Sequence, residues 1–204
     1  MEKLKLNEFQ NVLQDVRSAY RLLYLYQRRI MDTINFIGNQ YSYSVQEGWC
    51  KFSNRTPSPK SAGIINKWSW DWLNMYLYEF YFGSRKIKED KLYFSILIQS
   101  DTGMWDENSG NKLNVASFGN VAEAKSRLIF IVGKNGFDRP VEDLLKNKLD
   151  KTHFEFSDEN GEIKRYARAY DLENFLNEDT TMKIVKEFNK HCKDKGICDF
   201  LEEG

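Results

Sequence analysis

The feature that most limits how this chain can fold is an apolar stripe near its start. Its members follow a strict three-four spacing, which places them on one face of an α-helix. They are Leu6, Phe9, Leu13, Val16, Tyr20, Leu23, Gln27, Ile30, Ile34 and Ile37, and only Gln27 is polar. The pattern predicts one long helix over residues 1–38, which Gly38 and Asn39 would end.

This spacing is also that of a two-stranded coiled coil, in which the stripe packs against a second helix. The adjoining positions Val12, Ala19 and Tyr26 are apolar as well, so the stripe is wider than such a coil needs. Packing onto a sheet of the same chain explains a wide stripe equally well. The sequence therefore leaves two interpretations open, a homodimer through residues 6–37 or a helix that covers its own sheet.

Aromatic residues indicate that the chain contains a sheet. They make up 15% of the 204 residues, and they favour strands. The densest stretch is WSWDWLNMYLYEFYF at residues 68–82, whose alternation predicts a long strand in the middle of the sheet. Residues 91–100 predict the next antiparallel strand, with one face made of Leu92, Phe94, Ile96 and Ile98.

The remaining segments complete an α+β order. We expect a strand region at 41–53 with a turn at Glu47-Gly48, a strand at 128–132, a helix at 139–149, a hairpin of 152–157 with 162–169, a short helix after Asp171, and a last helix from about 180 to 194. The predicted fold is a long N-terminal helix packed on a mainly antiparallel, aromatic-rich sheet, followed by a C-terminal hairpin and helices. We expect a single domain over 1–204, comprising the helix 1–38, the sheet region 41–133 and the C-terminal region 139–204.

Composition narrows the function classes. Thirty basic residues balance thirty acidic ones, so no overall charge draws the chain to nucleic acid or to an anionic membrane. Three scattered cysteines, Cys50, Cys192 and Cys198, are typical of a reducing compartment. The first residues lack the apolar core of a signal peptide, and no apolar run is long enough to cross a membrane. We therefore expect a cytoplasmic protein without a membrane partner.

A first candidate site combines aromatic and basic residues at 51–72. Trp68, Trp70 and Trp72 could stack on bases, and Lys60 and Lys67 could hold phosphates, because residues 51–67 carry four basic and no acidic side chains. The alternative is that the rings belong to the core under the first helix, since a fully exposed aromatic row would promote aggregation. An intermediate arrangement buries Tyr76 to Phe82 and leaves Trp68 to Trp72 at the end of the sheet.

A second candidate site is acidic. Asp101 begins the acidic loop 101–107 around Trp105, and Asp71 could approach it from the neighbouring strand. Paired carboxylates can bind Mg²⁺ for phosphodiester chemistry, but the spacing of a nuclease core is absent, so solvated loop charges are the favoured interpretation.

Other catalytic signals are weak. The Cys192 and Cys198 region lacks the second close ligand pair of a structural zinc site, and Cys192 falls on the apolar face of the last helix. Neither histidine lies in the sequence context of a nucleophile. We predict no cofactor and no metal. The preferred function is a binding or assembly protein that acts through a protein–protein interface. The alternatives are a nucleic-acid-binding protein or divergent metal-dependent nuclease, and a small-ligand-binding domain.

Overall fold

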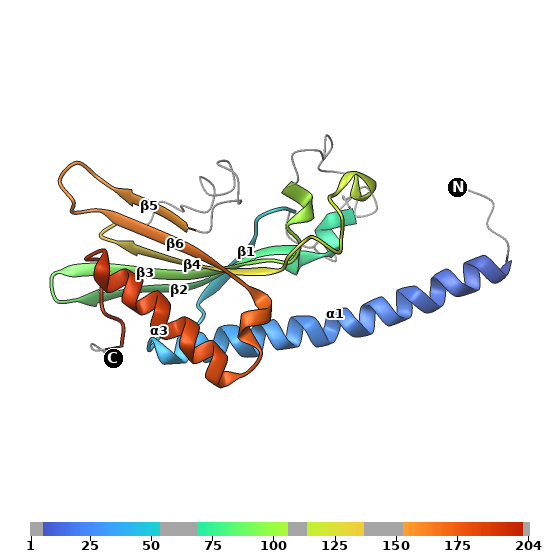
Figure 1. Cartoon of the computed structure of the whole chain (residues 1–204), viewed down its shortest axis with the longest axis horizontal. Coiled ribbons are helices and arrows are strands. Elements are labelled where there is room, and N and C mark those ends of the chain that lie inside the picture. The colour runs from blue at the N-terminus through green and yellow to red at the C-terminus, as the bar shows by residue number, and fades with distance from the viewer. Residues whose placement is uncertain (1–5, 54–68, 106–113, 137–152, 202–204) are drawn as a thin grey trace, which may run out of the picture.

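The computed structural model of the chain describes residues 6–53, 69–105, 114–136 and 153–201. The strands in these ranges form one antiparallel sheet in the order β1-β2-β3-β4-β6-β5, and the long helices α1 and α3 lie on one of its faces (Figure 1). The α+β class predicted from the sequence is therefore confirmed. None of the described helices is both long enough and apolar enough to cross a membrane.

The chain passes through its elements in a simple order. Helix α1 spans Leu6–Gln40 and strand β1 spans Glu47–Cys50. The short 3-10 turns η2 (Ser69–Trp72) and η3 (Asn74–Tyr76) precede the hairpin of β2 (Leu77–Ile87) and β3 (Asp90–Gln99). The turns η4 (Gly103–Trp105) and η5 (Val115–Ser117) precede β4 (Arg127–Lys134). The hairpin of β5 (His153–Ser157) and β6 (Lys164–Asp171) leads through η6 (Leu172–Phe175) to α3 (Glu178–Asp194).

The main core lies between the sheet and the two helices. The alternating residues of β3 that the sequence assigned to one face, Leu92, Phe94, Ile96 and Ile98, are all buried there. The Phe94 ring is at the centre, with Phe82 at 5.0 Å and Tyr41 at 5.4 Å between ring centroids. The Tyr41 hydroxyl donates a hydrogen bond of 2.6 Å to the Val185 carbonyl of α3, and this bond joins the end of α1 to the second helix.

Helix α1 packs on the sheet only with its C-terminal part. Its buried residues are Ile30, Thr33, Ile34, Ile37 and Gly38. The sequence predicted that Gly38 and Asn39 end the helix. In the structure Gly38 is still helical, and α1 continues to Gln40. A Cβ atom at Gly38 would lie 2.4 Å from the Phe82 ring and 2.9 Å from the Tyr43 carbonyl oxygen. The glycine is therefore required by the close approach of α1 to β2.

The strand predicted over 68–82 is wrong for residues 69–76, which form η2 and η3. The Leu73 and Tyr76 amides donate to the carbonyls of Trp70 and Leu73, so the chain turns here. The described ladder of β2 begins at Leu77, opposite Gln99 at the end of β3. A strand needs a paired neighbour, and the sheet ends where this pairing ends.

Further sequence predictions can be compared with the structure in the β1 and C-terminal regions. The turn predicted at Glu47-Gly48 is wrong, because both residues pair with β2, opposite Tyr81 and Phe80. The C-terminal hairpin is confirmed, with Gly161 at a φ of +70° in its turn. The last helix is also confirmed, and it begins two residues earlier than predicted, after a capping box at Asn177. The helix predicted at 139–149 lies outside the described residues.

Candidate functional site

The N-terminal half of α1 projects from the body of the protein. Every residue from 6 to 22 is exposed, and the first partly buried side chain is that of Leu23. Figure 1 shows this part of the helix continuing past the end of the sheet. We call residues 6–22 the arm.

The arm carries an apolar face that no described element covers. Seven exposed residues lie on it, and we call them the arm stripe: Leu6, Phe9, Val12, Leu13, Val16, Ala19 and Tyr20. Leu6 is 74% and Tyr20 is 70% exposed. The arm stripe continues, with the same spacing, the residues Leu23, Ile30, Ile34 and Ile37 that face the body. The sequence therefore identified the stripe, and the structure shows that its first half is left in solvent.

Charges in the arm are few and balanced. The arm contains Glu8, Asp15, Arg17 and Arg21, which give a net charge of zero, and all four lie off the arm stripe. Leu22, Tyr24 and Leu25 are also exposed, at 68%, 63% and 59%, but on other sides of the helix. The arm stripe is the longest continuous apolar face among the exposed residues of α1.

A small pocket lies where the arm meets the body. It has a volume of about 100 Å³ and is lined by Leu23, Tyr26, Gln27, Leu73, Met75, Tyr76 and Ser100. We call it the root pocket. The Tyr26 hydroxyl donates 3.0 Å to the Ser100 hydroxyl, which in turn donates 2.9 Å to the Met75 carbonyl. Burial raises the pKa of Tyr26, so this hydroxyl stays protonated at neutral pH. The rest of the pocket wall is mainly apolar.

The tryptophans of the predicted aromatic site separate in the structure. Trp70 is buried at 8% exposure, with ring centroids 4.7 Å from Tyr76, 5.0 Å from Phe52 and 5.9 Å from Phe118. Trp72 is 55% exposed. Trp68, Lys60 and Lys67 lie outside the described residues, as does the side chain of Trp105. The structure therefore places Trp70 in an aromatic cluster and leaves Trp72 in solvent.

The two predicted carboxylates occupy different surroundings. Asp71 is buried at 1% exposure. Asp101 accepts hydrogen bonds from the Gly103 amide at 2.7 Å and the Tyr76 hydroxyl at 3.3 Å, which stabilise the turn after β3. Burial, and to a smaller extent the Asp101 charge, raises the pKa of Tyr76. In the ranges that the structure describes, no three His, Cys, Asp or Glu side chains are grouped to share a metal ion.

Lys51, the first residue of the basic segment, forms a buried ion pair with Glu79. Sequence reasoning did not detect this pair. The Lys51 ammonium lies 2.7 Å from the Glu79 carboxylate, with only 8% and 1% of these side chains exposed. Neither carboxylate oxygen has the geometry of a further hydrogen bond to a described residue. Glu79 sits on the face of β2 away from α1, and only its strand position could have signalled its burial. Lys51 is thus committed to an internal partner and does not face a ligand.

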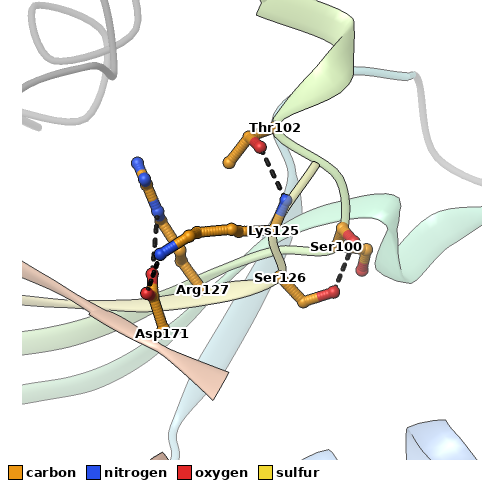
Figure 2. A network of polar contacts seen from close by, with 6 residues as sticks. All are labelled: Ser100, Thr102, Lys125, Ser126, Arg127 and Asp171. Carbon is orange, nitrogen blue, oxygen red and sulfur yellow. Dashed lines mark hydrogen bonds and ion pairs between the residues drawn. The ribbon is translucent and has the colours of Figure 1, made fainter. Parts of the chain in front are cut away.

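Figure 2 shows a polar network that joins the ends of three strands. The Asp171 carboxylate of β6 contacts the Lys125 ammonium, and it accepts 3.2 Å from Arg127 Nε of β4. The Lys125 amide donates 2.8 Å to the Thr102 hydroxyl, and the Ser126 hydroxyl donates 2.7 Å to the Ser100 carbonyl. The network therefore fixes the segment before β4 against the ends of β3 and β6.

An open hollow of about 380 Å³ adjoins this network and is lined by Ala124, Lys125, Ser126, Asp171, Leu172 and Glu173. Burial by itself raises the pKa of Asp171, but the hydrogen bond and charge of Lys125 and the charge of Arg127 outweigh it, so the pKa is lowered. Asp171 is consequently ionised at neutral pH and already neutralised by two cations. This arrangement is that of a structural clamp, not of a free general base.

Comparisons with known proteins give one result. The model of the PM0109 family matches residues 6–199, so the chain belongs to the PM0109 family. The match includes the arm, the sheet and α3. The description of this family names neither a reaction nor a ligand. Comparison with curated proteins and with solved structures gives no significant match.

Proposed function

We propose that this protein is a non-enzymatic assembly protein that binds a protein partner through the arm stripe. The observation that carries the proposal is the projecting helix, which presents seven apolar residues with a three-four spacing to solvent. Continuous exposed apolar faces of this kind mark interaction sites in soluble proteins. An amphipathic helix of this pattern binds a partner by burying its stripe against a second apolar surface.

The composition of the arm supports a partner. Most helical stability in proteins comes from packing of an apolar face, and an isolated helix of this length is marginal in water. The arm contains Asn7, Asn11, Val12, Val16 and Ser18, none of which is a strong helix former. A partner on the arm stripe would stabilise the helix and remove its apolar side chains from water.

Nucleic-acid binding and small-ligand binding are supported less well by the described residues. Trp70 is enclosed by other rings and Lys51 is paired with Glu79, so these two members of the 51–72 segment do not face a phosphate or a base. The open hollow beside the polar network is lined by the Asp171 carboxylate, which Lys125 and Arg127 already neutralise. A cytoplasmic location remains part of the proposal, and the three unbridged cysteines support it.

The test compares two variants that carry the same added charge on opposite sides of the arm. The double change Leu13→Glu and Val16→Glu places two carboxylates on the arm stripe. The control, Asn11→Glu and Ser18→Glu, places them on the opposite face. Burying unpaired charges costs several kcal/mol, so we expect the stripe variant to weaken association roughly a hundredfold or more. The control should associate as the unmodified protein does.

Association is measured in two ways with all three proteins. Sedimentation velocity over a range of concentrations reports self-association, and quantitative affinity enrichment from the source cells reports other partners. The proposal requires an interaction that the stripe variant loses and the control retains. A chain that is monomeric and whose enriched proteins are unaffected by the stripe variant would contradict it.

A further inference from the structure

The arm stripe and the body lie on the same side of α1. Leu23, Ile30, Ile34 and Ile37 continue the spacing of the stripe, and they line the root pocket or the core beneath the sheet. A regular three-four pattern drifts by only about 20° per seven residues around a straight helix. A helix bound on the arm stripe would therefore lie on about the same side of α1 as the sheet. Figure 1 shows that the arm itself extends past the end of the sheet.

This placement restricts how a second copy can bind. In a parallel pair, residues 23–37 of the second copy would lie opposite residues 23–37 of the first. That face of the first helix is already covered by its own sheet, so the two bodies would collide. In an antiparallel pair, the body of the second copy lies beyond Leu6 of the first, and the arms overlap only along their exposed lengths. The geometry thus allows the antiparallel arrangement alone.

The length of the free stripe fixes the register. The two copies of α1 overlap from Leu6 to Leu23, about 26 Å along the helix axis. This overlap uses the whole arm stripe and stops where the body begins. It sets Leu13 against Val16 of the second copy, Phe9 against Tyr20, and Leu6 against Leu23. In each of these pairs, residues from the two alternating positions of the three-four spacing face each other. This is the core packing of an antiparallel coiled coil. The flanking Val12 then meets Ala19 of the second copy, and these small side chains permit close approach.

In this register the root pocket receives a side chain from the second copy. Leu23 lines the pocket together with Leu73 and Met75, so the Leu6 side chain that lies opposite Leu23 meets an apolar cavity of about 100 Å³. Charge does not oppose the pairing, because the arm has no net charge and its four charged residues lie off the stripe. Arg17 faces the neutral Gln10 of the second copy. A two-fold pair also satisfies the requirement that one surface be complementary to itself.

We propose that the partner of the arm is a second copy of this chain, bound antiparallel, with Leu6 of each copy seated in the root pocket of the other. This inference rests on the proposed function and specifies its partner. It predicts a homodimer whose two bodies lie at opposite ends of a paired helix.

Distances between spin labels test the arrangement without disturbing the stripe. Asn11, Ser18 and Leu25 lie seven residues apart on the outer face of α1, and each is replaced singly by Cys and labelled. In the proposed register the labels at 11 and at 18 are each displaced along the axis by about 10 Å from their counterparts, and those at 25 by about 31 Å. Pulsed dipolar spectroscopy should give equal distances for 11 and 18 and a clearly longer one for 25. The unmodified protein, treated in the same way, controls for the native cysteines.

The root pocket is tested by a matched pair of leucines. Leu6 and Leu22 are similarly exposed, at 74% and 68%, but only Leu6 lies on the stripe. Leu6→Ala should weaken dimerisation about tenfold or more, measured by sedimentation equilibrium, because it removes a side chain buried in the dimer. Leu22→Ala should leave dimerisation unchanged.

The outcomes separate this inference from the proposed function. Three equal label distances indicate a parallel dimer, and a longer distance at 11 than at 18 indicates another register; either overturns the arrangement and leaves the stripe as an interface. A chain that stays monomeric at the highest concentration it tolerates overturns the second copy as partner. The proposed function then stands or falls on whether another protein binds through the stripe in the enrichment experiment.

Discussion

At the residue scale, losing either member of the buried pair of Lys51 and Glu79 should destabilise the protein, because the other charge would be left buried without a partner. Their charged atoms lie 2.7 Å apart and both side chains are nearly excluded from water. Lys51→Met leaves the Glu79 carboxylate buried and unpaired, so we expect a loss of about 3–5 kcal/mol of unfolding free energy. Urea denaturation measures this loss. The double variant Lys51→Met and Glu79→Leu should recover most of it, and a double variant as unstable as the single one would contradict this account.

Asp171 provides a second prediction at this scale, for pH dependence. Its pKa is lowered in the folded protein, with Lys125 and Arg127 outweighing the effect of burial. A lowered pKa contributes stability above the ordinary pKa of an aspartate, and the contribution is lost as the pH falls through the folded value. Asp171→Asn should therefore cost about 1 kcal/mol at pH 7, and the difference should shrink in acid below about pH 4.

The control for Asp171 is Glu173→Gln, which removes one negative charge from an exposed neighbour in the same hollow. Chemical denaturation of the two variants and the unmodified protein is compared at neutral and acidic pH. Equal pH dependence of all three would show that the network around Asp171 contributes nothing to stability.

At the scale of elements, the contact between α1 and β2 depends on Gly38. An added methyl group would lie 2.4 Å from the Phe82 ring, which is only 1% exposed and packs against Phe94. Gly38→Ala should therefore destabilise the protein by about 1–3 kcal/mol, although alanine is the better helix former. The neighbouring Asn39→Ala is exposed and should change stability by about 0.5 kcal/mol or less. A Gly38→Ala variant as stable as the unmodified protein in urea would show that Phe82 can move.

At the scale of the whole molecule, the proposed function assigns association to the arm and folding stability to the body. The buried residues of α1 begin at Ile30, so removal of residues 1–22 should leave the melting temperature of the body unchanged in dilute solution. The proposed dimer would stabilise the folded state by mass action, because a second copy binds the folded arm and not the unfolded chain. The full-length protein should therefore melt at higher temperature as its concentration rises, whereas the truncated chain should not. Melting of the truncated chain well below the full-length protein in dilute solution would instead mean that the arm packs on its own body.

Local spacing predicted the elements whose pattern has a single interpretation. The residues from Leu6 to Ile37 indicated a long helix, and the alternation from Leu92 to Ile98 indicated both a strand and the face that it buries. The C-terminal hairpin of 152–157 with 162–169 was located from the sequence as well. The same reasoning failed at residues 69–76, because alternating aromatic residues fit a strand and a set of turns equally well. The end of β3 opposite Leu77 decided between them.

The surroundings of the candidate site residues were harder to predict from the sequence than the helices and strands, because they depend on tertiary structure. The sequence placed Lys51 in a basic segment and allowed Trp70 to be either a stacking residue or part of the core. The fold placed Glu79 beside Lys51 and enclosed Trp70 among Phe52, Tyr76 and Phe118. Most of these contacts do not follow from local sequence. Lys51 is 28 residues from Glu79, and Trp70 is 18 residues from Phe52 and 48 from Phe118, so these side chains meet only in the folded chain.

The sequence by itself determined that the first segment is an amphipathic helix, since side-chain spacing along a helix is a local property of the chain. It could not determine what the apolar face touches, because the spacing is the same from Leu6 to Tyr20 as from Leu23 to Ile37. Only the tertiary structure decided this. The body of the protein begins to contact α1 at Leu23, and the described residues leave the arm stripe exposed because the sheet ends there.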